Sequence, residues 1–161
     1  MLRLTQMSDQ DFQDYLQKAV AEYAQEHVRA GNWHPDEAMQ RSEGEFRKLL
    51  PDGPRSKNQY MYTLVDEATS EKVGMIWFFF DRDRLQQSAF IYDFMVYEEF
   101  RRRGYGSQAL ATAEQIARDL GAMTIDLHVF GHNQAARALY EKAGYQVTNL
   151  NLSKRLRSDK G

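Results

Sequence analysis

The sequence contains no cysteine. Disulfide bonds, a cysteine-based zinc site and a cysteine nucleophile are therefore excluded, and the composition fits a reducing compartment. Long hydrophobic runs are also missing, because the longest, Met75 to Phe80, is far shorter than the roughly 20 residues that cross a membrane. The first residues, Met1 to Gln6, form no apolar signal-peptide core. We therefore expect a cytoplasmic protein that makes no use of a membrane.

A strong excess of either charge is missing too. The net charge is −2 and the isoelectric point is near 6.1, which argues against a protein that mainly grips nucleic acid. The four histidines are scattered without metal-ligand spacing, so no metal is expected. A chain of 161 residues with this hydrophobic content can build one substantial core. We expect a single domain over residues 1–152 and a frayed polar tail over 153–161.

Hydrophobic periodicity predicts an α/β protein, with a mixed sheet and helices on both of its faces. The element order is β-α-α-β-β-β-α-β-α-β, in which three consecutive strands form an antiparallel meander and a later β-α-β piece forms one parallel crossover. The expected strands are Leu2–Leu4, Tyr60–Val65, Lys72–Phe80, Ser88–Val96, Thr124–Val129 and Tyr145–Leu152, and the expected helices are 9–29, 35–50, 105–120 and 133–143.

A basic turn, Arg101-Arg102-Arg103-Gly104-Tyr105-Gly106-Ser107, joins the strand that ends at Val96 to the helix that follows. The start of a helix presents unpaired N–H groups and a positive dipole end, and glycine lets the backbone approach an anion closely. The turn therefore predicts a phosphate site. Two alternatives stay open, namely a solvated basic corner and a nucleic-acid patch.

Two motifs together resemble the GNAT superfamily of N-acyltransferases, which use acyl-coenzyme A. Arg101, Gly104 and Gly106 match its pattern Arg/Gln-x-x-Gly-x-Gly/Ala between a strand and a helix. A second stretch, from Asn133 to Tyr145, is similar to its other signature. The resemblance implies acetyl-CoA as co-substrate. Its implied binding residues are the backbone of Phe94, Met95 and Val96, the turn residues Arg101, Arg102, Arg103, Gly104, Tyr105, Gly106 and Ser107, and Asn133, Ala136 and Tyr140 on the later helix.

The resemblance also implies how the reaction is catalysed. Asn133 bonds the cofactor arm, and small Ala136 leaves room for it. Tyr140 donates a proton to the departing thiolate, which suits a phenol with an ordinary pKa near 10. The N–H of Val96 steadies the oxyanion. The alternative for Tyr140 is simple packing in the core.

The base that deprotonates the amine is open between Asp93 and a water chain. Asp93 is the only charged residue within Phe90–Val96, and apolar neighbours raise the pKa of a carboxyl group. It could equally bond a loop N–H or orient a cationic substrate. Several other residues are candidates for the acceptor side, although their faces cannot be assigned from sequence: Trp33, His34, Tyr62, Trp77 and Asp81.

The function that follows is acetyl transfer from acetyl-CoA to a primary amine, by direct attack in a ternary complex. The acceptor is a small molecule or a peptide, which the sequence does not distinguish. A non-catalytic acyl-CoA-binding or regulatory module of the same fold is the alternative. A homodimer is plausible, since many relatives of this superfamily pair through their last strands.

Overall fold

Five strands form one mixed sheet in the computed structural model, which describes residues 1–158. Each strand lies beside its sequence neighbour, in the order β1-β2-β3-β4-β5. The first three pairings are antiparallel and β4–β5 is parallel, which confirms the predicted meander and crossover. The strands are β1 (Leu2–Gln6), β2 (Gln59–Asp66), β3 (Lys72–Phe79), β4 (Ser88–Val96) and β5 (Thr124–Leu127).

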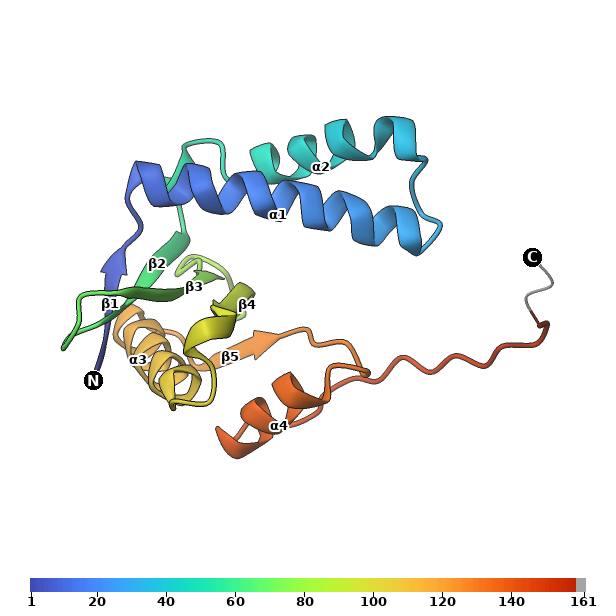
Figure 1. The fold of residues 1–161 in the computed structure, drawn as a ribbon. Helices are drawn as coiled ribbons and strands as arrows, with labels where there is room; N and C mark the ends of the chain where they lie inside the picture. The colour runs from blue at the N-terminus through green and yellow to red at the C-terminus, as the bar shows by residue number, and fades with distance from the viewer. Residues whose placement is uncertain (159–161) are drawn as a thin grey trace. The chain divides into compact units, whose positions relative to one another are not determined.

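Helices cover both faces of this sheet, as predicted. Helices α1 (Asp9–Arg29) and α2 (Pro35–Leu49) lie over one face, and α3 (Tyr105–Leu120) lies over the other (Figure 1). Phe12 and Leu16 of α1 pack on the core residues of β2 and β3 that point to their side, namely Met61, Met75 and Trp77. Helix α3 buries its small apolar stripe, which consists of Ala109, Leu110, Ala113 and Ala117.

Local capping explains why two helices have the predicted bounds. At the start of α1, the Ser8 hydroxyl accepts a hydrogen bond from the Asp11 N–H at 3.1 Å. Helix α3 lies between two left-handed glycines, Gly104 (φ 82°) and Gly121 (φ 112°). Two short 3₁₀ turns, η1 (Gly53–Arg55) and η2 (Glu98–Phe100), occupy connecting loops.

The chain forms two compact units, one over Met1–His128 and one from Val129 onward. The first contains the sheet and the helices α1 to α3, and the second contains α4 (Gln134–Lys142). The single domain over 1–152 therefore stays a prediction.

The predicted last strand, Tyr145–Leu152, is wrong. The described chain has neither helix nor strand there, and the side chains of Val147 and Leu150 are 62% and 72% exposed. Alternating apolar residues give only a preference for the extended chain, and a strand forms when its backbone groups find a paired neighbour. In the tail, residues 153–158 also lack regular structure, and residues 159–161 lie outside the described residues.

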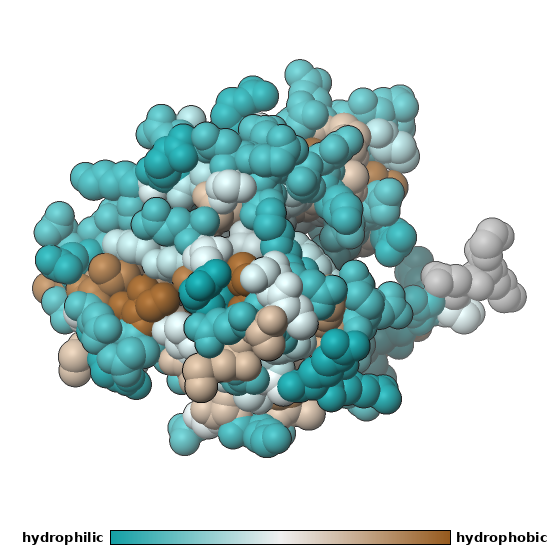
Figure 2. All heavy atoms as spheres, turned by 60° about the vertical axis from the view of Figure 1, so that its left-hand side comes forward, coloured by the Kyte–Doolittle hydropathy of each residue, from teal (hydrophilic) through white to brown (hydrophobic). Residues whose placement is uncertain are grey.

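Hydrophilic side chains cover most of the surface on the face shown in Figure 2. Within residues 1–158, no helix is both long enough and apolar enough to cross a membrane. The same part of the chain brings no three histidine, aspartate or glutamate side chains together as ligands for a metal ion.

Candidate active site

The parallel pairing between β4 and β5 stops halfway along β4. It joins Ser88–Ile91 to Thr124–Leu127. The register between β3 and β4 shifts at the next residue, since Trp77 lies opposite Asp93 while Phe78 lies opposite Ile91. Tyr92 is thus the extra residue of a β-bulge, which bends a strand and ends local pairing. From Tyr92 to Val96, β4 has an open side that β5 does not cover.

The register also shows which backbone groups face this open side. The Tyr97 N–H donates to the Val73 carbonyl of β3 at 2.8 Å. Backbone groups alternate in direction along a strand, so Met95 points toward β3, opposite Met75, whereas Phe94 and Val96 point to the open side. The backbone groups of Met95 thus face β3 rather than the open side, and the binding roles of Phe94, Met95 and Val96 stay predictions.

Two of the outward groups are already bonded within the chain. The Phe94 N–H donates to the Asp93 carboxylate at 2.9 Å, and the Val96 carbonyl accepts from Nε of Arg101 at 3.0 Å. The open side thereby presents the Phe94 carbonyl as an acceptor and the Val96 N–H as a donor. An extended ligand with amide groups would add to such an edge as a strand does.

The basic turn has the backbone shape of an anion site. Arg102 (φ 65°) and Gly104 (φ 82°) both take the left-handed conformation, from which anion-binding concavities of N–H groups are built. The N-cap residue of α3 is Gly104, which has no side chain. The N–H groups in the first turn of this helix therefore have no side-chain cap. The three arginines are exposed, and the Arg103 guanidinium lies 5.6 Å from the centre of the Phe100 ring.

Two contacts hold the start of α3 against the edge of the sheet. The Tyr105 hydroxyl donates to the Asp66 carboxylate at the end of β2, and this bond is the main cause that lowers the Asp66 pKa. Asp66 is itself fixed by the N–H groups of Ala68 and Thr69, at 2.7 and 3.1 Å. The Leu2 N–H donates to the Gln108 side chain at 3.0 Å.

If the turn binds coenzyme A, as the sequence predicts, replacing Tyr105 with Phe should weaken that binding severalfold, because the turn loses its bond to the Asp66 carboxylate and is less well placed. Calorimetric titration with coenzyme A measures the change. Tyr60→Phe is the matched control, since this ring stacks on Phe78 at the other end of β2. Equal affinities for the two variants would contradict the positioning role of Tyr105.

Asp93 points from β4 toward α1. Its Oδ2 accepts from the Tyr15 hydroxyl at 2.7 Å, and its Oδ1 accepts from the Phe94 N–H. Burial raises the pKa of Asp93, the two hydrogen bonds oppose that rise, and the charges of Glu22 and Glu26 add to it. The sequence left open a bond from Asp93 to a loop N–H, and the observed N–H donor, Phe94, instead belongs to β4 itself. The sequence did not single out Tyr15, which occupies a core-facing position of a helical pattern.

A row of aromatic rings lies on the same face of the sheet as Asp93. Trp77 stacks on Tyr92 with ring centres 4.7 Å apart and contacts Phe46 of α2 at 6.2 Å. Two other acceptor candidates lie elsewhere, since Tyr62 stacks on Phe78 on the opposite face and Asp81 pairs with Arg84.

The loop between α1 and α2 holds the remaining acceptor candidates. Trp33 is buried and stacks on His27 with ring centres 4.0 Å apart, as a loop anchor does. The exposed His34 caps α2, where its Nδ1 accepts from the Asp36 N–H at 3.2 Å. The sequence left these residues open between lining a pocket and anchoring the loop, and their contacts are those of anchors.

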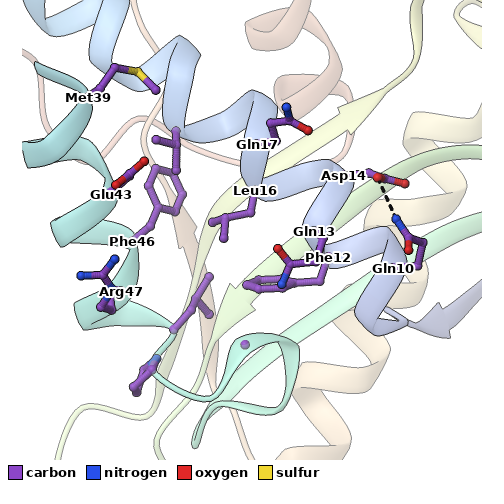
Figure 3. Close-up of a pocket in the computed structure, with 14 residues that line it drawn as sticks. Gln10, Phe12, Gln13, Asp14, Leu16, Gln17, Met39, Glu43, Phe46 and Arg47 are labelled. Atoms are coloured by element: carbon purple, nitrogen blue, oxygen red, sulfur yellow. Dashed lines mark hydrogen bonds between the residues drawn. The ribbon is translucent and has the colours of Figure 1, made fainter.

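A groove of about 780 Å³ lies between α1 and α2. Figure 3 shows its apolar floor, to which Phe12 and Leu16 of α1 and Met39 and Phe46 of α2 contribute. Its rim is polar, with Gln10, Gln13, Asp14, Gln17, Glu43 and Arg47. None of the predicted site residues lines this groove.

The second unit carries the other predicted residues on α4. Asn133 is the N-cap of this helix, since its Oδ1 accepts from the Ala136 N–H at 3.2 Å. Ala136 and Tyr140 are half-buried. The rings of Tyr140 and Tyr145 meet edge to face at 5.6 Å, and the Tyr145 N–H donates to the Tyr140 carbonyl at 2.9 Å.

Comparison with known proteins identifies the family. The sequence model of the Acetyltransferase (GNAT) family matches residues 15–145. The uncharacterized N-acetyltransferase YycN of Bacillus subtilis is 42% identical over 157 residues, which cover 96% of this chain and 99% of YycN. Its relative YdgE, from the same organism and equally uncharacterized, is 36% identical over 153 residues, 95% of this chain and 97% of YdgE.

Comparison with solved structures supports the same family. The crystal structure of YycN superposes with a TM-score of 0.85 at 40% identity, over 98% of this chain and 100% of that one. A Bacillus anthracis protein assigned as a streptothricin acetyltransferase, solved with acetyl coenzyme A, aligns with a TM-score of 0.52 at 26% identity, over 59% of this chain and 52% of its own. The chain therefore belongs to the GNAT family of acetyltransferases.

Proposed function

We propose that this chain is an N-acetyltransferase that moves an acetyl group from acetyl-CoA to a primary amine. The observation that carries the proposal is the open side of β4 beyond the Tyr92 bulge, which leads directly into the left-handed turn before α3. The solved streptothricin acetyltransferase relative that holds acetyl coenzyme A supports this choice of co-substrate.

The residues would hold acetyl-CoA in two ways. The Phe94 carbonyl and the Val96 N–H pair with the amide groups of the pantetheine arm. The N–H groups from Arg102 to Ser107 and the arginine side chains bind the pyrophosphate. On α4, the Asn133 side chain bonds the arm, and Ala136 leaves room for it.

In the reaction, the amine nitrogen attacks the thioester carbon, the carbon–sulfur bond breaks, and coenzyme A leaves. Asp93 takes the proton that the amine must lose, and the Val96 N–H stabilises the oxyanion. Tyr140 gives a proton to the leaving thiolate. The carboxylate of Asp93 and the exposed ring of Tyr92, which stacks on the buried Trp77, favour a cationic amine, because aromatic faces and carboxylates both attract positive charge.

The test is release of coenzyme A thiol with a panel of polyamines, amino acids, aminoglycosides and peptides. The chain has no cysteine, so the protein itself gives no thiol signal. We expect thiol release that depends on one class of amine and a product that is heavier by one acetyl group. Coenzyme A binding without turnover on any amine would instead favour the non-catalytic module.

We also propose that the protein works in the cytoplasm, and a homodimer remains our prediction for its assembly. Light scattering of the purified chain gives the mass directly. A mass of one chain would reject the dimer.

A further inference from the structure

Tyr15 and Asp93 form a contact that joins α1 to β4. The two residues are 78 positions apart, and the Tyr15 hydroxyl lies 2.7 Å from Oδ2 of Asp93. The other carboxylate oxygen accepts from the Phe94 N–H at 2.9 Å. Each oxygen of Asp93 therefore has its own donor, one from a helix and one from the strand, and together they fix the plane of the carboxylate.

We infer that Tyr15 is a positioning residue, which keeps the Asp93 carboxylate charged and oriented for taking a proton from the acceptor amine. The inference rests on the proposed function, since it assigns Tyr15 a part in that reaction. Tyr15 itself does not take up the proton. It stays a fixed donor to Asp93 while the proton moves from the amine nitrogen to the carboxylate.

The surroundings of the pair explain why a donor is needed. Burial disfavours the ionised form of Asp93, and the negative charges of Glu22 and Glu26 on α1 add to this effect. On β3, the residue opposite Asp93 is Trp77, which does not titrate. The hydroxyl of Tyr15 is the side-chain group that acts against these influences, alongside the backbone N–H of Phe94.

The protonation state of Tyr15 fits a donor that does not relay protons. Burial raises its pKa well above the ordinary tyrosine value, and the neighbouring charges of Asp93 and Glu22 raise it further. The phenol is therefore protonated at neutral pH. A protonated phenol can donate to a carboxylate, and the 2.7 Å distance to Oδ2 of Asp93 is that of such a bond.

The experiment compares Tyr15→Phe with the wild-type chain. Removing the hydroxyl removes a bond to the charged form of Asp93, so the pKa of Asp93 rises. Because the base acts when it is deprotonated, the acid limb of the kcat/KM profile should move up by about one pH unit. Activity at the high-pH plateau should be largely retained. Tyr23→Phe is the matched control, since Tyr23 lies on the same helix and packs on Phe46 and Trp33.

A second measurement does not need turnover. Carbon-13 NMR of labelled aspartate carboxyl groups follows the titration of Asp93 directly, with Asp93→Asn to assign the signal. An upward shift in Tyr15→Phe and none in Tyr23→Phe supports the positioning role. An unchanged Asp93 titration in Tyr15→Phe overturns it, even if activity falls. If the NMR shift is present but no amine is acetylated, the proposed function fails while the effect of Tyr15 on Asp93 stands.

Discussion

The Tyr140→Phe variant should lose about 10²- to 10³-fold in kcat while its affinity for coenzyme A changes little. The reason is chemical. The substitution keeps the ring and removes only the hydroxyl that we propose as the proton donor to the leaving thiolate. Steady-state kinetics with the best amine of the panel, together with calorimetry for coenzyme A, separates the two effects.

Tyr145→Phe is the matched control for this prediction. Its ring meets that of Tyr140 at 5.6 Å, so it reports general disturbance of the same helix end. We expect Tyr145→Phe to keep kcat within a few fold. Full activity of Tyr140→Phe, or an equal loss in both variants, would contradict the acid role of Tyr140.

The Gly74→Ala variant should lose about 3 kcal/mol of unfolding free energy. A β-carbon at this position of β3 would lie 2.1 Å from the Met95 carbonyl oxygen and 3.0 Å from Cα of Val96, both backbone atoms of β4. The two strands would have to separate beside the proposed acetyl-CoA edge. Urea unfolding of the full chain, followed by circular dichroism, measures the loss.

Gly44→Ala is the control, because it makes the same chemical change in a helix. A β-carbon at Gly44 of α2 would meet nothing within 4 Å. Alanine is the better helix former, so this variant should gain about 0.5–1 kcal/mol. Similar stability of both variants would show that β3 and β4 accommodate a methyl group at Gly74. That result would contradict the expected clash between this methyl group and the backbone of β4.

The sequence predicts the bounds of a helix best where capping residues mark its ends. The bounds of α1 and α3 match because Ser8 caps one and because Gly104 and Gly121 enclose the other. The strand over Tyr145–Leu152 was wrong for a related reason. Its pattern is local, whereas a strand depends on a partner that the pattern does not specify.

The features of the candidate site also fall into two groups, those that a local sequence pattern predicts and those that depend on how distant parts of the chain pair. The turn over Arg101–Ser107 can be predicted from the sequence because its arginines and both glycines, Gly104 and Gly106, lie within seven consecutive residues. The direction of the Met95 backbone and the bulge at Tyr92 depend on the register with β3, which the alternation of residues does not reveal. The hydrogen bond between Tyr15 and Asp93 joins residues that are 78 positions apart in the chain. It could therefore be identified only from the folded structure.

The proposed function requires coenzyme A to bind along the open side of β4 and at the start of α3. Amide chemical shifts of the nitrogen-15-labelled chain, titrated with coenzyme A, test it most directly. We expect saturable shifts that are largest at Val96 and from Gly104 to Ser107, and small at Met95, whose N–H faces β3. No saturable shift, or the largest shifts at the groove residues Leu16 and Met39, would contradict it.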